Sequence, residues 1–217
     1  MDSSIFLQQM INGFSLGSMY ALIAIGYTMV YGVLRLINFA HGDIMMVGAY
    51  VALFSMTSLN LPFIAAIVAA AAISALLGMT TDRIAYRPLR KAPRISLLIT
   101  AIGVSFFLEN LFNMLFGGTP KPFPVPEYLE QAIHVSGVSV TLVTLVVPIV
   151  TLILLALVLF VLYKTKYGMA IRALAFDVAT VNLMGIDANL IIAVVFAIGS
   201  TLAAIAGVFW AVSYPSV

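Results

Sequence analysis

The fold is decided by residues 142–162, which read LVTLVVPIVTLILLALVLFVL. The run is apolar on every face of a helix and lacks the alternation of a barrel strand. A hydrocarbon core of about 30 Å is crossed by about 20 such residues in a helix. Because a bilayer admits only helices or closed barrels, the run predicts a membrane-spanning helix and an all-α fold.

The composition of the whole chain agrees with this prediction. Of 217 residues, 63% are hydrophobic and 8% are charged, whereas about a quarter are charged in a soluble domain. The mean hydropathy is +1.16. A soluble globular domain is therefore excluded, and a net charge of +2 gives no reason to expect nucleic acid as a partner. The absence of cysteine excludes disulfides, thiolate metal sites and cysteine nucleophiles.

Apolar runs predict a polytopic bundle of about six spans. The second run is the weakest, at 16 residues, and the N-terminus has neither a basic region nor a cleavage signature. We therefore interpret the first run as a retained span. The predicted spans are Met10–Val33, Ile44–Leu59, Pro62–Met79, Ile95–Phe116, Val138–Tyr163 and Leu190–Val212.

Basic residues predict the orientation of these spans. Residues 82–94, between the third and fourth spans, hold five basic residues, so the positive-inside rule places this loop in the cytoplasm. The N-terminus and residues 117–137 then lie outside, and residues 164–189 lie inside. Nine of the ten Lys and Arg residues face the cytoplasm in this arrangement, and only Lys121 lies outside.

Two further patterns concern packing and the outer loop. Small residues four apart predict close helix contacts: Gly13 and Gly17 in the first span, and Gly199, Ala203 and Gly207 in the last. Residues 117–126 are dense in proline and are predicted to be extended. This segment is either a surface for an external partner or a simple connector.

Polar residues 35–43, RLINFAHGD, separate the first two spans. As a plain cytoplasmic turn, the segment would leave Arg35, His41 and Asp43 solvated. As a broken or re-entrant element, it would carry Asn38 and His41 toward a pathway and explain the short second span. His41 is not expected to bind a metal, because no cysteine or nearby second histidine accompanies it and His134 belongs to the outer loop.

Glu109 and Asn113 form a second polar cluster on one face of the fourth span. A carboxylate at this depth is protonated, paired or wetted, so the cluster is either a packing hydrogen bond or a lining of the pathway. A proton-coupled mechanism would need more such carboxylates.

Residues 164–187 form the third cluster, which is too elaborate for a connector. Ile171, Leu174, Ala175 and Val178 follow helical spacing between Gly168 and Gly185. The pattern predicts a short amphipathic helix bounded by glycines. It would either rest on lipid or dock a soluble partner.

Two of these stretches carry a family resemblance. GYTMVYG at residues 26–32 leads into INFAHGD at 37–43, and YGMAIRA at 167–173 leads into LMGI at 183–186. The chain resembles the permease subunits of branched-chain amino acid ABC importers, of the LivH type, over essentially its whole length. Many importers carry Glu-Ala-Ala where this chain has Ile171-Arg172-Ala173, a variant that the branched-chain group shares. Since family members continue past the last span found here, we expect a chain truncated at its C-terminus.

The resemblance implies one transmembrane permease domain over residues 1–217, with a cytoplasmic coupling segment at 164–188, in a bacterial inner membrane. Its partners would be a second homologous permease, two cytoplasmic ATPases, an external substrate-binding protein and membrane lipid. The chain would be no enzyme and bind no cofactor. ATP would be used by the partner subunits, in keeping with the absence of a Gly-Lys-Ser or Gly-Lys-Thr loop. The residues expected to couple to the ATPases are Gly168, Arg172, Ala173, Asp177 and Gly185.

The expected mechanism is alternating access, with Asn38, His41, Asp43, Glu109 and Asn113 as pathway candidates. A rival interpretation is an autonomous channel or secondary carrier for a small polar solute such as urea or an amide. A third is a scaffold subunit with no pathway. The exact substrate stays open in all of these interpretations.

Overall fold

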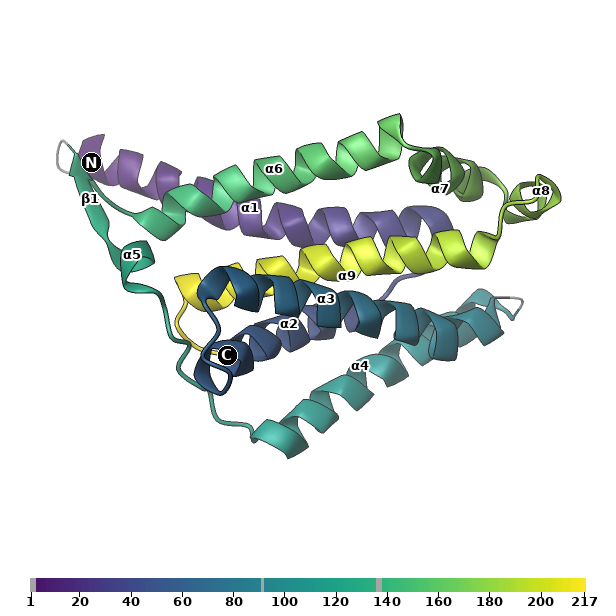
Figure 1. Cartoon of the computed structure of the whole chain (residues 1–217), viewed down its shortest axis with the longest axis horizontal. Coiled ribbons are helices and arrows are strands. Elements are labelled where there is room, and N and C mark those ends of the chain that lie inside the picture. The colour runs from purple at the N-terminus through teal and green to yellow at the C-terminus, as the bar shows by residue number, and fades with distance from the viewer. Residues whose placement is uncertain (1–2, 91, 136–137) are drawn as a thin grey trace.

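The computed structural model of the chain describes residues 3–90, 92–135 and 138–217. It is an elongated bundle of long helices that run back and forth along one axis (Figure 1). The long helices are α1 (Ser3–Leu34), α2 (Ala40–Thr57), α3 (Phe63–Thr81), α4 (Arg94–Phe116), α6 (Leu142–Lys164) and α9 (Ala188–Ser213). The short elements are the π-helical turn η1 (Asp82–Tyr86), the 3-10 turn η2 (Arg87–Leu89), α5 (Glu127–Glu130), α7 (Lys166–Phe176) and α8 (Val178–Leu183).

The prediction of an all-α membrane protein is confirmed at this level. Five of the helices, α1, α3, α4, α6 and α9, are long and apolar enough to cross a membrane. The predicted second span corresponds to α2, which is 18 residues long and begins at Ala40 rather than Ile44. One small addition to the prediction is an antiparallel hairpin between β1 (Ala132–Val135) and β2 (Val138–Thr141).

Helix α9 lies at the centre of the bundle, packed on α1, α2 and α3. The contacts run through small residues: a Cβ placed on Gly26 of α1 would lie 2.7 Å from the Gly199 carbonyl oxygen of α9. Gly207 lies against the backbone of Met45 in α2. The predicted Gly199–Gly207 packing face is therefore confirmed. The same prediction for Gly13 and Gly17 is wrong within this chain, because no atom lies within 4 Å of a Cβ built on either residue.

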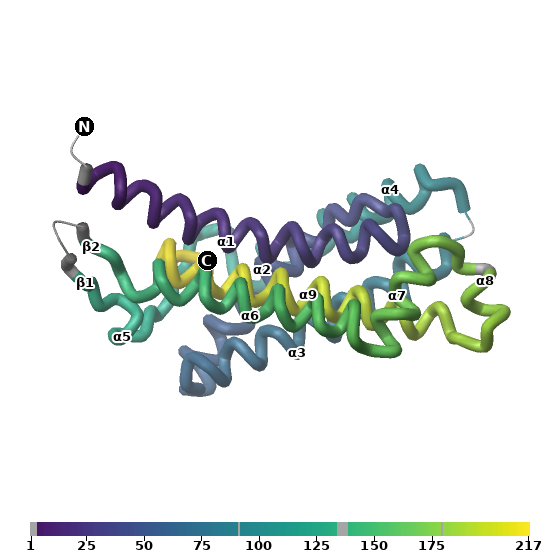
Figure 2. The backbone as a smooth tube through the Cα atoms, turned by 90° about the horizontal axis from the view of Figure 1, so that it is seen from above, coloured from purple at the N-terminus to yellow at the C-terminus, as the bar shows by residue number. Residues whose placement is uncertain are grey.

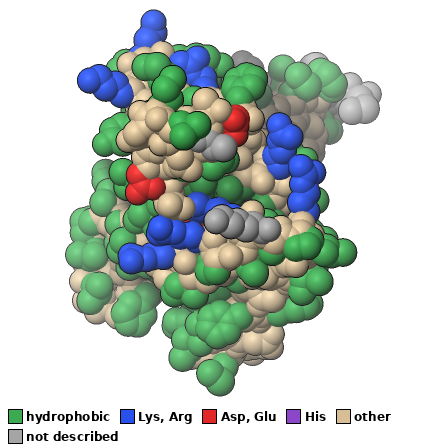
Figure 3. Space-filling view, turned by 90° about the vertical axis from the view of Figure 1, so that its right-hand side faces the viewer, with side chains coloured by type: hydrophobic (Ala, Val, Ile, Leu, Met, Phe, Trp, Pro, Cys, Tyr) green, Lys and Arg blue, Asp and Glu red, His purple; other side chains and the backbone are tan. Residues whose placement is uncertain are grey.

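The two ends of the bundle differ in charge. One end carries the α1–α2 connection, η1, η2, α7 and α8, and the other carries the N-terminus, the hairpin and the C-terminus (Figures 1 and 2). Figure 3 shows the first end, where blue Lys and Arg side chains gather. The basic residues on elements at this end are Arg35, Arg83, Arg87, Arg90, Arg94, Lys164, Lys166 and Arg172, whereas Lys121 lies near the other end and Lys91 is outside the described residues.

The proline-rich segment is extended, as predicted. Its backbone pairs with the last residues of the chain: the amide of Lys121 donates to the Val217 carbonyl at 2.8 Å, and the Val217 amide donates back at 2.9 Å. At the same end, the side chain of Gln8 holds the backbone of Ser139 in β2 by two hydrogen bonds. The segment and the hairpin together cover one end of the bundle.

Candidate functional site

The chain breaks between α1 and α2. Arg35 has a φ of +50°, a left-handed conformation that ends α1. Residues 35–40 then alternate between exposed and buried side chains, so Leu36, Asn38 and Ala40 point into the bundle. A plain solvated turn is therefore wrong for this segment, except at Arg35, which is exposed as that interpretation expected.

Asn38 and His41 lie in the core rather than in water, at 2% and 3% exposure. The Asn38 side-chain oxygen accepts a hydrogen bond of 2.7 Å from the Tyr86 hydroxyl in η1. His41 Nε2 lies 3.2 Å from the carbonyl of Ile23 in α1, and its ring meets the edge of Tyr27. These contacts fix the start of α2 against α1 and η1.

Asp43 is buried on another side of α2, toward α4. Ser105 and Glu109 of α4 are close enough to interact with its carboxylate. One Asp43 carboxylate oxygen and the Asn38 amide nitrogen are buried without a hydrogen-bond partner among the described residues. Buried polar atoms are usually satisfied, so both atoms have capacity for a further partner.

Glu109 and Asn113 line a groove of about 360 Å³ between α2 and α4, which residues 117–120 and 216–217 also line. Met46, Tyr50 and Phe112 supply its apolar part. The structure thus brings Glu109 and Asn113 together in one groove, and Glu109 also lies near the buried Asp43, which does not line that groove. Asn38 and His41 lie in the packed core. The five pathway candidates do not form one pocket.

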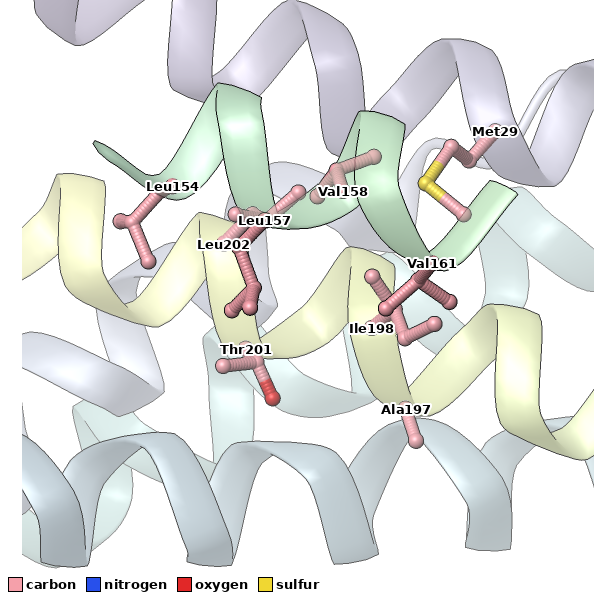
Figure 4. A pocket seen from close by; sticks show the side chains of 9 residues that line it. All are labelled: Met29, Leu154, Leu157, Val158, Val161, Ala197, Ile198, Thr201 and Leu202. Atoms are coloured by element: carbon pink, nitrogen blue, oxygen red, sulfur yellow. The ribbon is translucent and has the colours of Figure 1, made fainter. Parts of the chain in front are cut away.

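A second groove between α1, α6 and α9 has a volume of about 220 Å³ and is apolar (Figure 4). Its lining side chains carry no charge, and the Thr201 hydroxyl is their one oxygen. The charged groups of an amino acid would be unpaired in this groove, so it is not the polar pathway.

The coupling segment is two helices rather than one. α7 ends at Phe176, Asp177 takes an extended conformation (φ −155°, ψ 114°), and α8 follows. The Thr180 hydroxyl donates to the Asp177 carboxylate, a side-chain bond at the start of a helix that favours a restart over continuation. The prediction of one continuous helix is therefore wrong.

The glycines at the ends of this segment have different roles. A Cβ on Gly168 would clash with the carbonyls of Val161 and Leu162, so glycine lets α7 fold back onto the end of α6. Gly185 follows α8 with a φ of +78°, which suits glycine. Arg172 stacks over the ring of Tyr163, 5.1 Å from its centre, and Ala173 is exposed on α7.

The outer faces of α7 and α8 are unusually apolar. Phe176 and Leu183 are 90% and 87% exposed, and Met184 beside them is also exposed. Between the two helices lies a groove of about 600 Å³ whose lining includes Met169, Ala173 and Phe176. Exposed apolar patches of this kind mark interaction surfaces.

Sequence reasoning missed a polar cluster at the same end. Arg90 is 17% exposed and donates from one terminal nitrogen to both oxygens of the buried Asp82 carboxylate, at 2.6 and 2.7 Å. Its other terminal nitrogen donates to the side-chain oxygen of Asn189 in α9 at 2.7 Å. In residues 3–90, 92–135 and 138–217, no three His, Cys, Asp or Glu side chains gather closely enough to hold a metal ion.

Comparisons with known proteins give the chain its family. The model of the family described as branched-chain amino acid transport system / permease component matches residues 9–217. The high-affinity branched-chain amino acid transport system permease protein BraD of Pseudomonas aeruginosa is 39% identical over 96% of this chain and 72% of its own length. The corresponding LivH proteins of Escherichia coli K12 and Salmonella typhimurium are 41% and 40% identical over 94% of this chain and 70% of theirs.

No solved structure shows a significant match to the chain. The family predicted from residues 26–43 and 167–186 is confirmed by these relatives. The chain belongs to the branched-chain amino acid transport system permease family.

Proposed function

We propose that this chain is one of two related permease subunits of an ATP-driven importer of branched-chain amino acids in a bacterial inner membrane. The observation that carries the proposal is the family match over residues 9–217, together with relatives named as high-affinity branched-chain amino acid permeases. The partners proposed are two cytoplasmic ATPases and an external binding protein. ATP is hydrolysed by the ATPases, and this chain provides the pathway.

The charge distribution supports an orientation for this importer. All described basic residues except Lys121 lie on elements at one end of the bundle, and cytoplasmic ends of membrane proteins are rich in Lys and Arg. We place this end in the cytoplasm and the N-terminus outside. In this arrangement α2 crosses the membrane as a short sixth span, and its buried start lies at the cytoplasmic side.

The α7–α8 unit is proposed to dock the ATPases. It lies at the cytoplasmic end in this orientation, and Phe176, Leu183 and Met184 offer an apolar surface of the kind that enters a groove of a soluble partner. Gly168 and Arg172 hold α7 on the end of α6. Movement of a docked ATPase would therefore move the ends of the long helices.

The α2–α4 groove is proposed to be part of the pathway. Glu109 is an exposed carboxylate on a helix that crosses the membrane, where a lipid contact would be costly. A wetted pathway between two permease chains removes that cost. Asn38 and His41 are proposed to set the position of α2, which forms one wall of the groove, as alternating access proceeds.

The central test is uptake by purified complex in proteoliposomes. Vesicles that hold the permeases and ATPases, with binding protein outside, should accumulate labelled leucine, isoleucine or valine only when ATP is inside. A panel that includes other amino acids, urea and short amides identifies the substrate. Conduction by this chain alone, without ATP, would instead establish the channel or carrier interpretation. No effect of any substitution at Asn38 or Glu109 would favour a scaffold.

The pathway role of Glu109 is tested by Glu109→Leu. We expect uptake per ATP to fall about 10-fold or more, because a hydrogen bond to a charged group contributes roughly 1.5–3 kcal/mol. The matched control is Asn110→Leu, since the Asn110 amide donates to the Phe106 carbonyl of its own helix at 2.7 Å. An equal loss in both variants, or a loss in neither, contradicts the proposed pathway.

A further inference from the structure

The polar contacts at the cytoplasmic end form one connected series that reaches from α8 to the start of α2. The Asn182 side-chain oxygen of α8 accepts from the Ala188 amide, the first residue of α9, at 3.3 Å. Asn189, the next residue, accepts from Arg90 at 2.7 Å, and Arg90 holds Asp82. The docking unit is thereby connected to the turn that follows α3.

The series continues from this turn to the break before α2. Asp82 and Tyr86 are the first and last residues of η1, and Tyr86 donates to Asn38 at 2.7 Å. The backbone carbonyl of Asn38 in turn accepts from the His41 amide at 3.2 Å, in the first turn of α2. Residues 82–90 thus hold the start of α9 at one end and the start of α2 at the other.

The π-helical geometry of η1 makes this connection possible. An α-helix places residues four apart on one face at a fixed angle, whereas a π-helical turn widens the helix and re-aims its side chains. Here Asp82 and Tyr86 are both buried, Asp82 toward Arg90 and Tyr86 toward Asn38 and the ring of Phe196 in α9. Such turns are frequent at functional positions in helices.

Burial stiffens the inner part of the series, where Asp82, Tyr86 and Asn38 are all buried. A buried polar group that loses its partner has no water to replace it, and the free-energy cost is high. The groups of such a network therefore tend to move together rather than separate. Within the part of the chain that the structure describes, the Arg90 Nε atom is buried without a partner, so the hydrogen bonds of the guanidinium go to Asp82 and Asn189. A shift of the start of α9 therefore reaches Arg90 through Asn189.

We propose that Arg90 and Tyr86 are positioning residues that convey movement of the α7–α8 unit, through η1 and η2, to Asn38 and the start of α2. The inference rests on the proposed function, because it needs an ATPase to move the docking unit. It assigns a role to Asp82, Tyr86, Arg90 and Asn189, which lie outside both the docking surface and the α2–α4 groove.

The test is the number of substrate molecules taken up per ATP hydrolysed by the reconstituted complex. Tyr86→Phe removes one hydroxyl and keeps the ring on Phe196, and Arg90→Lys keeps the charge but cannot hold Asp82 and Asn189 together. We expect each variant to keep ATP hydrolysis within about twofold and to lower the uptake per ATP about fivefold or more. The controls are Arg87→Lys, an exposed arginine of the same turn, and Tyr31→Phe, an exposed tyrosine of α1.

Two further variants separate transmission from stability. Asn189→Asp keeps a hydrogen-bond acceptor for Arg90 and should retain the wild-type uptake per ATP. Asn189→Leu removes the acceptor and should lower the uptake per ATP. The double variant Tyr86→Phe with Arg90→Lys should be no worse than the worse single variant, because both interrupt one series. The yield of assembled complex on size exclusion shows whether each variant folds.

The possible outcomes decide between the two proposals. The proposed role of Arg90 and Tyr86 is overturned if uptake per ATP is unchanged in Tyr86→Phe and Arg90→Lys, or if their losses multiply in the double variant. The proposed function still stands in that case, provided that the wild-type complex shows ATP-dependent uptake. If Tyr86→Phe does not assemble, the comparison of uptake per ATP between Asn189→Asp and Asn189→Leu decides, and equal values overturn the proposed role of Arg90. Wild-type vesicles without ATP-dependent uptake overturn the proposed function and this inference with it.

Discussion

Replacing Phe176 with serine should weaken the binding of the ATPases to this permease about 30-fold. Phe176 is 90% exposed at the end of α7, so the change removes little packing within the chain. Truncation of an aromatic residue at the centre of an interface costs about 2 kcal/mol or more, which corresponds to this factor. Leu183→Ser on α8 should act in the same direction. Titration of detergent-solubilised permease with purified ATPase measures the effect.

The matched control is Leu59→Ser, which removes a leucine that is 60% exposed from the connection between α2 and α3 at the opposite end. It should leave ATPase binding unchanged. The orientation is checked in the same material: residues 1–217 hold no cysteine, so a single cysteine at position 183 of this chain reports its side of the membrane. Labelling of Leu183→Cys by an impermeant maleimide from outside intact cells would place α7 and α8 on the exterior and end the docking proposal.

Hydrophobic periodicity and charge predicted most of the fold. Long apolar runs specify membrane helices because the bilayer demands internal hydrogen bonding of the backbone, and this demand depends little on tertiary context. The Gly199–Gly207 repeat likewise predicted the packing face of α9. The Gly13 and Gly17 pair has the same spacing, but no atom lies within 4 Å of a Cβ built on either residue. Spacing shows which residues share a face and not which helix packs on that face.

The polar cluster of Arg90 could not be predicted in the same way. In the sequence, residues 82–94 form a basic loop, and nothing local shows that Asp82 continues α3 through a π-helical turn. Asn189 lies about a hundred positions away along the chain, so its bond to Arg90 depends on tertiary packing alone. The break at Asp177 could have been predicted from the sequence. Asp177 followed three residues later by Thr180 is a local capping signal. The helical spacing of Leu174 and Val178 favoured one continuous helix instead.

Gly207→Ala should destabilise the bundle although alanine is the better helix former. A Cβ at this position would overlap the backbone carbonyl of Met45, and backbone atoms cannot turn aside as a side chain can. Overpacking of this kind costs about 1–3 kcal/mol or more, against a gain in helix propensity of about 1 kcal/mol. For a net loss of about 2 kcal/mol in a domain of this size, the midpoint of thermal unfolding falls by roughly 4–8 °C. Trp210, the single tryptophan of the chain, lies one turn from Gly207 and reports the transition by fluorescence.

Gly17→Ala in α1 is the control that isolates the packing effect, because the same methyl group meets no atom within 4 Å. Its helix propensity gain is the same, so the midpoint should stay level or rise slightly. The difference between the two variants is therefore the cost of separating α9 from α2, free of any general effect of glycine in a helix. Equal midpoints for Gly207→Ala and Gly17→Ala would show that α2 and α9 do not meet at Met45. The central place of α9, on which the positions of η1 and α2 depend, would then be wrong.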